Sequence, residues 1–334
     1  MKLQLKFGLI LSIISLLTFI SYAKAETKVV ASIKPIHSLI SYVMDGVGTP
    51  GLLVDGSSSP HTFQLKPSHA TMLQEADIVF WIGEDLETFL ETPLESIAKD
   101  AKQVTLMESE DIEMLKFREK NVFDDHDDHG DEHDDHDEHE EHEEHGDEHD
   151  EHEDEHDDHA HHDGHNHGEF DIHFWLDPEI AKTIVQIAAK EISEIDPANA
   201  SKYEANAAKA LNKLDQLIND TRGKINKDAT YVVFHDAFQY FEQRFGIEVI
   251  GALTVNPEIL PGAKQLAEIR EVIEHEAVNC LFSEPQFNPT IAETIASDTG
   301  VKAAVLDPLG AELEPGKDLY FDLISDMASS FESC

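Results

Sequence analysis

The residues of this chain that could do chemistry are concentrated in one run, from Asp124 to Glu169. The run holds 15 histidines and 25 carboxylates in 46 residues, and it contains no lysine or arginine. Neutral imidazole is a common nitrogen ligand of Zn²⁺, Cu²⁺ and Ni²⁺, while carboxylates add oxygen ligands and a field that concentrates cations. The composition therefore predicts that the chain handles a divalent transition metal.

We expect this run to be disordered without metal and to bind metal through its histidines. Its only apolar residue is Ala160, so burial cannot offset the entropy of ordering. A purely solvating acidic tract is the alternative, but solvation needs no histidine, and copper would compete with zinc for open imidazole clusters. The ligands of this accessory metal loop would be His126, His129, His133, His136, His139, His142, His145, His149, His152, His156, His159, His161, His162, His165 and His167.

Three of the six histidines outside the run stand where a ligand site would form. His61 follows the predicted strand GLLV, His235 ends the predicted strand YVVF, and His173 lies in DIHFWLDP before a predicted helix. Ligands of open parallel sheets collect at the carboxyl ends of strands, and Asp307, which ends VKAAVLD, reaches the same edge. We expect these residues to meet in one cleft. The others fall in or at the start of predicted helices, with surface-like neighbours, and we expect them to be satisfied or solvated: His37, His69 and His275.

Three neutral imidazoles with a carboxylate or a water in the fourth position form a tetrahedral site that suits Zn²⁺, with Zn–N distances of about 2.0–2.1 Å. A site for Mn²⁺ would use more oxygen ligands. We therefore predict zinc ligands at His61, His173 and His235, with Asp307 or water in the fourth position. Neighbouring aspartates could orient the rings, although Asp177 is better placed to cap the helix that begins at Pro178; they are Asp171, Asp177 and Asp236.

The elements that must position these residues alternate between strand and helix. Short apolar runs separated by helical patterns predict an α/β fold with parallel sheets, in two lobes joined by a long helix. A single helix is expected around Leu86–Ala98. The expected division is a signal peptide (1–25), an N-terminal lobe (26–120), the insertion (121–169), the end of the N-terminal lobe (170–197), the linking helix (198–227) and a C-terminal lobe (228–334).

The charge and the N-terminus limit the partners and the compartment. The formal charge is −45 at pH 7, so nucleic acid and anionic membrane surfaces, which require basic patches, are poor partners. Lys2 and Lys6 precede an apolar stretch, Phe7–Ile20, and small residues then predict cleavage after Ala25. This stretch is too short for a comfortable transmembrane helix. We expect a mature protein that is free and soluble outside the cytoplasm.

The chain contains two cysteines, Cys280 and Cys334. An even number in a secreted chain suggests one disulfide, which would stabilise the fold by about 4 kcal/mol in the chain-entropy model. Two free thiols remain an alternative. Zinc ligation is less favoured, because neither cysteine has a CxxC or CxxH partner.

The joint set of motifs resembles a known family. In chain order the strings SPHTFQLKPS, ADIVFWIGEDLE, DIHFWLDPEIA, VVFHDAFQYFEQRFG, EPQFNP and LDPLG are similar to those of the zinc-binding solute-binding proteins of bacterial ABC importers. The resemblance covers essentially the whole mature chain. It implies two (β/α)-type lobes bridged by a long helix, with metal held in the cleft between them by His61, His173 and His235. It also implies a location in the periplasm of a Gram-negative bacterium and a disulfide between Cys280 and Cys334.

The same resemblance bears on the choice of metal. Manganese-binding members usually carry a glutamate where this chain has His235. A His-rich acidic insertion before DIHFWLDP is typical of the zinc-binding members. Some zinc members have a glutamate just before the first ligand histidine, whereas this chain has Pro60. That difference leaves Asp307 or water as the fourth ligand.

The expected function is a non-enzymatic carrier with no catalytic residues. It would capture Zn²⁺ as transported ligand and deliver it to a membrane permease of an ABC transporter, with the His-rich run as an accessory collector and a periplasmic zinc donor as a further partner. The alternatives are a periplasmic zinc buffer or adhesin, a carrier of manganese or another divalent metal, and a zinc hydrolase. The hydrolase is disfavoured because the chain has no HExxH motif.

Overall fold

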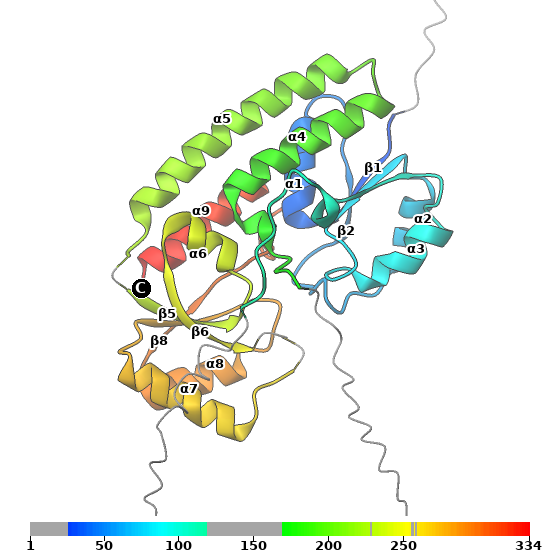
Figure 1. Cartoon of the computed structure of the whole chain (residues 1–334). Coiled ribbons are helices and arrows are strands. Elements are labelled where there is room, and N and C mark those ends of the chain that lie inside the picture. The colour runs from blue at the N-terminus through cyan, green and yellow to red at the C-terminus, as the bar shows by residue number, and fades with distance from the viewer. Residues whose placement is uncertain (1–25, 119–168, 228, 255–256, 258) are drawn as a thin grey trace, which may run out of the picture.

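The computed structural model describes residues 26–118, 169–227, 229–254, 257 and 259–334. The predicted signal peptide and all fifteen histidines of the accessory loop lie outside these residues. Figure 1 shows two lobes, with a pair of long helices along one side of the molecule.

The first lobe, called the N lobe here, is built on a parallel sheet in the order β2-β1-β3-β4. Every residue of β1 and β3 is buried, as expected of strands covered on both faces. The strands are β1 Val29–Ile33, β2 Gly51–Val54, β3 Ile78–Trp81 and β4 Lys102–Thr105. The helices are α1 Lys34–Val43, α2 Pro67–Gln74 and α3 Glu91–Ser96, with short 3₁₀ turns at Thr88–Leu90 and Leu106–Glu108.

The expectation of one helix around Leu86–Ala98 was wrong in its extent. A 3₁₀ turn precedes the short helix α3. Pro93 accounts for this boundary, because a proline deep inside a helix removes a hydrogen bond and clashes with the preceding turn. Starting the helix at Glu91 places Pro93 in the first turn, where the backbone N–H groups have no partner within the helix.

The second lobe, called the C lobe, has a parallel sheet in the order β6-β5-β7-β8. Both sheets therefore confirm the predicted α/β class. In each sheet the strand order reverses between two central strands, and ligands of open α/β sheets bind at such switch points. The strands are β5 Thr230–His235, β6 Glu248–Thr254, β7 Cys280–Ser283 and β8 Lys302–Val305, and the helices are α6 Gln239–Phe245, α7 Ala263–His275, α8 Thr290–Thr299 and α9 Leu319–Glu332.

Two long helices connect the lobes. Helix α4 (Pro178–Ile195) follows the 3₁₀ turn η5 (Phe174–Leu176), and α5 (Ala200–Lys224) runs back beside it toward β5, as Figure 1 shows. Asp177 caps α4 by accepting a hydrogen bond of 2.8 Å from the Glu179 amide, as expected. At 25 residues, α5 spans about 38 Å, enough to reach from one lobe to the other. The chain positions that divide the lobes stay a prediction.

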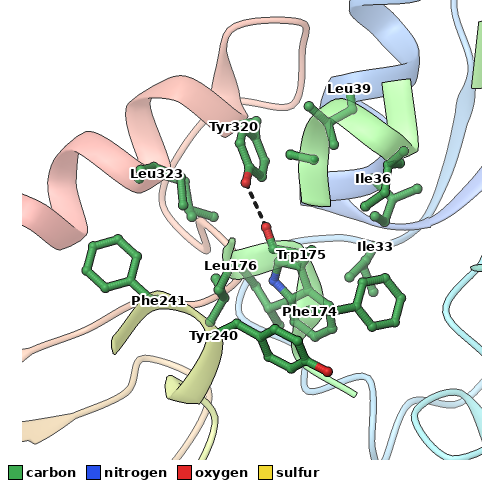
Figure 2. Packing of buried hydrophobic residues seen from close by; sticks show 14 of the residues in the cluster. Ile33, Ile36, Leu39, Phe174, Trp175, Leu176, Tyr240, Phe241, Tyr320 and Leu323 are labelled. Atoms are coloured by element: carbon green, nitrogen blue, oxygen red, sulfur yellow. Dashed lines mark hydrogen bonds between the residues drawn. The ribbon is translucent and has the colours of Figure 1, made fainter. Parts of the chain in front are cut away.

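One apolar cluster, on one face of each sheet, joins the two lobes, and each lobe has a separate cluster on the other face of its sheet. One buried cluster runs from Val29 on β1 to Phe331 on α9, and α9 packs against both α1 and α5. Figure 2 shows Trp175 of η5 at the centre of this packing, where its carbonyl accepts a hydrogen bond from the Tyr320 hydroxyl. The Trp175 indole donates in turn to the carbonyl of Pro308. Both of these hydrogen bonds join η5 to the C lobe.

A buried lysine adds a polar link between the lobes. The Lys34 side chain, 3% exposed, begins α1 in the N lobe. Its ammonium donates to the carbonyls of Gly310, Ala311 and Leu313 at 2.8, 2.9 and 2.8 Å. All three of its protons thus have an acceptor in one C-lobe loop, which offsets the cost of burying the charge.

The two cysteines form the expected disulfide. Cys280 is the first residue of β7, and Cys334 follows α9; their Cα atoms lie 5.9 Å apart. The bridge ties the end of the chain to the C-lobe sheet. Among the residues described in the structure, no helix has the length and apolar character needed to span a membrane.

Candidate metal centre

The structure brings together the three histidines singled out in the sequence. His61 lies in the loop after β2, His235 is the last residue of β5, and His173 immediately precedes η5. One ring nitrogen of each lies within 4.8 Å of the others, and they form the one such group found in the described part of the chain. The ring centroids are 5.0 Å apart for His173 and His235, 5.7 Å for His61 and His235, and 6.0 Å for His61 and His173. Three nitrogens this close can bind one ion.

The site is a small, mostly enclosed cavity. His173 and His235 are 4% and 3% exposed, while His61 is partly exposed. The cavity volume is about 20 Å³, which leaves room for little more than one water-sized body. Much of its wall is apolar and contains Pro60, Leu86, Trp175, Phe287, Pro308 and Leu309. Such a wall excludes bulk water and strengthens charge interactions inside.

His173 is oriented by Asp171. The Asp171 carboxylate, 1% exposed, lies 2.8 Å from Nδ1 of His173 and also accepts the His173 backbone N–H at 3.0 Å. A carboxylate only accepts, so Nδ1 is the protonated nitrogen and Nε2 keeps its lone pair for a metal. This arrangement of carboxylate, imidazole and metal fixes the ring and raises its basicity.

His235 faces a second carboxylate, which the sequence reasoning missed. Oε2 of Glu284 lies 3.6 Å from Nδ1 of His235. Burial raises the pKa of Glu284 to about 8, with nearby His173 acting in the opposite direction. A positional signal was present, because Glu284 directly follows β7, the neighbour of β5 at the switch point.

Asp307, considered as a fourth ligand, does not belong to the group of converging ligand atoms. Its Oδ1 accepts from the amides of Leu309 and Gly310 at 3.1 and 3.0 Å and from Nε2 of Gln286 at 2.9 Å. Its Oδ2 accepts from the Ala311 amide at 2.5 Å. The carboxylate therefore holds the turn after β8, and these donors occupy it.

The remaining acidic neighbour, Asp236, pairs with an arginine instead of orienting a histidine ring. Its Oδ1 lies 3.6 Å from the guanidinium of Arg118, which also forms an ion pair with Glu242. Burial raises the pKa of both carboxyls, and Arg118 opposes the shift in each case; for Glu242 the resulting value is about 7. These residues form a charged cluster behind His235.

The other histidines do not join the site. His37 is 5% exposed, so the expectation of a surface-like position was wrong for it. Its Nε2 lies 3.1 Å from the Pro50 carbonyl, whereas its buried Nδ1 has no hydrogen-bond partner among the described residues. His69 is partly exposed and His275 is exposed, as expected of residues on helices.

The described ends that flank residues 119–168 are paired beside the site. Lys116 and Phe170 form an antiparallel bridge, and the Asp171 amide donates to the Leu115 carbonyl at 2.8 Å. The Tyr240 hydroxyl donates to the Asp171 carbonyl at 2.7 Å and accepts from the Leu115 amide at 2.8 Å. We call these paired segments, 115–118 and 169–171, the stem. The stem thus ends on the carboxylate that orients His173.

Comparison with known proteins gives consistent matches over nearly the whole chain. Residues 29–334 match the model of the ZnuA family, described as zinc-uptake complex component A, periplasmic. Proteins named high-affinity zinc uptake system protein ZnuA from Brucella abortus and Haemophilus influenzae are 46% and 41% identical, covering 94% and 93% of this chain and 93% of each relative. A crystal structure of ZnuA superposes with a TM-score of 0.71 at 21% identity, covering 92% of this chain and 98% of that one.

Proposed function

Since the chain belongs to the ZnuA family of periplasmic zinc-uptake components, we propose that His61, His173 and His235 hold the Zn²⁺ that it carries. The observation that supports this proposal is the convergence of three ring nitrogens within 4.8 Å of one another in a cavity of about 20 Å³. Zinc favours tetrahedral sites with nitrogen donors. The chemistry of the donors therefore agrees with the cargo named in the relatives.

The donor set also favours zinc over manganese. All three converging ligand atoms are imidazole nitrogens, whereas Mn²⁺ prefers sites with more oxygen ligands. Asp171 strengthens the preference, because a carboxylate on Nδ1 of His173 raises the basicity of the coordinating nitrogen. We assign no catalytic step to the site.

The remaining parts of the proposal concern the route of the ion. We place the mature protein free in the periplasm after cleavage at Ala25, and we assign it a membrane permease of an ABC transporter as the acceptor of zinc. A zinc-donor protein in the periplasm is a further proposed partner. A deletion strain without a redundant importer should fail to grow in zinc-limited medium. Normal growth of that strain would instead favour a periplasmic buffer.

Replacement of each histidine by alanine tests the site directly. In competition titrations of the full chain against a zinc chelator, we expect each of His61→Ala, His173→Ala and His235→Ala to lose the tightest zinc equivalent. The matched control is His275→Ala, because His275 is exposed on α7 and should leave that equivalent intact. Retention of the tight equivalent in all three site variants would refute the assignment.

For the His-rich insertion we propose an accessory role, in which it gathers zinc with moderate affinity and raises the supply to the cleft. Fifteen histidines provide many weaker ligand sets, whereas the cleft provides one enclosed set. Deleting residues 124–167 should therefore leave one tight zinc equivalent and remove several weaker ones in calorimetry. If the deletion removed the tight equivalent as well, this division between cleft and insertion would be wrong.

A further inference from the structure

Helix α6 joins the elements that carry two of the three converging histidines. It begins shortly after His235, which ends β5, and it packs against η5, which His173 immediately precedes. The ring of Tyr240 on α6 lies edge-on to that of Phe174 in η5, with 6.4 Å between the ring centroids. His173 and His235 are far apart in the chain, because α4 and α5 lie between them. Helix α6 therefore links directly two ligands that the sequence separates.

Tyr240 holds the backbone that precedes His173. Its side chain is 2% exposed, and its hydroxyl donates to the carbonyl of Asp171 at 2.7 Å. The carboxylate of the same aspartate lies 2.8 Å from Nδ1 of His173. Burial raises the pKa of Tyr240 above its ordinary value, so at neutral pH the hydroxyl keeps the proton that it donates. Tyr240 thus acts on the ring of His173 through one intervening residue.

Arg244, one turn further along α6, holds the backbone that follows His173. Its Nε donates to Oδ1 of Asp177 at 2.7 Å, and its Nη2 donates to Oδ2 at 2.6 Å. A pair with two parallel hydrogen bonds fixes direction as well as distance. Asp177 is connected back to His173 by η5, in which the Leu176 amide donates to the His173 carbonyl at 3.1 Å. Helix α6 therefore holds His173 from both sides along the chain.

The connection from α6 to His235 is short and well packed. The Ala237 amide donates to the His235 carbonyl at 2.9 Å, and Phe238 and Phe241 are fully buried. A helix that is packed in this way cannot shift without opening the close-packed interior around it. A displacement of α6 would change the separation of His173 and His235, whose ring centroids, 5.0 Å apart, are the closest of the three pairs.

We propose that Tyr240 and Arg244 are positioning residues that set the separation of His173 and His235 for zinc. The inference rests on the proposed function of the three histidines. The cost of bringing two imidazoles together is then met when the protein folds rather than when the ion binds, which raises affinity. Neither Tyr240 nor Arg244 lines the cavity, so each acts on the site through an aspartate, Asp171 or Asp177.

Replacing Tyr240 by phenylalanine tests the first contact, because the ring remains and the hydroxyl is lost. In chelator competition with the full chain, Tyr240→Phe should weaken zinc binding about tenfold, as is usual for groups that orient metal ligands. The matched control is Tyr231→Phe, since Tyr231 is a buried tyrosine of the same lobe whose hydroxyl bonds to the carbonyls of Asn226 and Phe331. This control should leave zinc affinity unchanged.

Replacing Arg244 by methionine tests the second contact with little disturbance of the core, since the Arg244 side chain is 33% exposed. Arg244→Met should also weaken zinc binding about tenfold. Its matched control is Arg270→Met, which breaks an ion pair with Asp298 between α7 and α8 and should leave zinc affinity unchanged. Because Arg244→Met retains the buried tyrosine, it tests the proposal even if Tyr240→Phe does not fold.

Cobalt absorption separates a change in ligand geometry from a general loss of stability. Half an equivalent of Co²⁺ is added to the full chain, and the visible bands report the arrangement of ligands around the ion. A parallel His173→Ala sample measures the bands from ions bound elsewhere in the chain. We expect Tyr240→Phe and Arg244→Met to shift or weaken the bands, whereas Tyr231→Phe and Arg270→Met should match wild type.

The outcomes separate this inference from the proposed function. If the His173→Ala sample gives the wild-type spectrum, the ion is not in the cleft and the proposed function fails. Should the cleft bind Co²⁺ while Tyr240→Phe and Arg244→Met keep the zinc affinity and the spectrum of wild type, the proposal about α6 fails alone. Equal losses in the control variants, Tyr231→Phe and Arg270→Met, would trace the effect to the stability of the C lobe and would also overturn it.

Discussion

At the scale of single residues, the candidate site depends on how carboxylates are shared between the histidines and the backbone. Asp171 serves the ring and the backbone N–H of His173 together, so the ring and its peptide move as one unit. Asp307 accepts hydrogen bonds only from the backbone amides of the turn after β8 and from the side-chain amide of Gln286. The two aspartates therefore have different roles, and the difference follows from the donors that surround each one.

Removing the charge of Asp171 should weaken the site without emptying it. We expect Asp171→Asn to lower zinc affinity about 10- to 100-fold, because an amide supports the metal-bound imidazole less strongly than a carboxylate does. Chelator competition measures the change, with Asp100→Asn on the surface as the control. An unchanged dissociation constant in Asp171→Asn would show that the pair does not tune the metal.

At the scale of elements, a buried glutamate holds the start of the segment that follows β3. Oε2 of Glu87 accepts from the amides of Ile82 and Gly83 at 2.9 and 3.0 Å, and its side chain is fully buried. Burial raises the pKa of Glu87 from 4.5 to about 7, while the neighbouring hydroxyl of Ser32 and these amides act in the opposite direction. The backbone just after β3 is thus held by a carboxyl group that can gain or lose a proton near neutral pH.

This pKa predicts the direction of a pH effect on stability. Between pH 4.5 and about 7 the folded protein holds the Glu87 proton more tightly than the unfolded chain, so this contribution to stability is present at low pH and is lost as pH rises. Glu87→Gln should remove this pH-dependent loss of stability, because glutamine does not ionise. Relative to wild type, its free energy of unfolding should rise by about 1–3 kcal/mol between roughly pH 5 and pH 8.

Urea unfolding at several pH values measures this difference. Glu84→Gln is the matched control, since Glu84 is exposed three residues away and its replacement should give no such trend. A difference between Glu87→Gln and wild type that stays constant with pH would contradict the prediction.

The order of elements was predictable, whereas several details of the site were not. Alternating apolar and helical patterns identified both parallel sheets. Placement at strand ends singled out His61 and His235, and placement just before a helix added His173. Sequence could not show that Asp307 would be occupied by the amides of its own turn, because hydrogen bonding of that kind depends on the local backbone. Glu284 was missed because strand order, which places β7 beside β5, is not readable from one sequence.

At the scale of the whole molecule, the two lobes share an apolar cluster that covers one face of each sheet. Tyr320 and Trp175 link α9 to η5, and Lys34 links α1 to a loop of the C lobe. Separating the lobes would expose apolar surface and break the three hydrogen bonds of the Lys34 ammonium, and both changes cost free energy. The site between them is therefore built on a stiff frame.

The disulfide should stabilise the C lobe, where it joins the end of α9 to β7. Replacing both cysteines, with Cys280→Ala and Cys334→Ser, should lower the free energy of unfolding by about 2–4 kcal/mol, because Cys334 ties the end of α9 to β7 across 54 residues of sequence. Denaturant titration measures the loss, and reduced wild type should behave like the variant. An unchanged unfolding midpoint would mean that α9 is held by packing alone.

The stem also has a practical consequence. Because Lys116 and Phe170 are paired, the described segments on either side of residues 119–168 lie next to each other, which is a geometry that suits an inserted domain. A fluorescent protein whose own termini lie close together could replace the native insertion there without prying the segments apart. Asp171, which follows directly, orients His173, so such a fusion would place the emitter next to the ion-binding cleft. The stem is thus a natural attachment point for a zinc-reporting sensor, whose response would be read as a change in emission on titration with zinc.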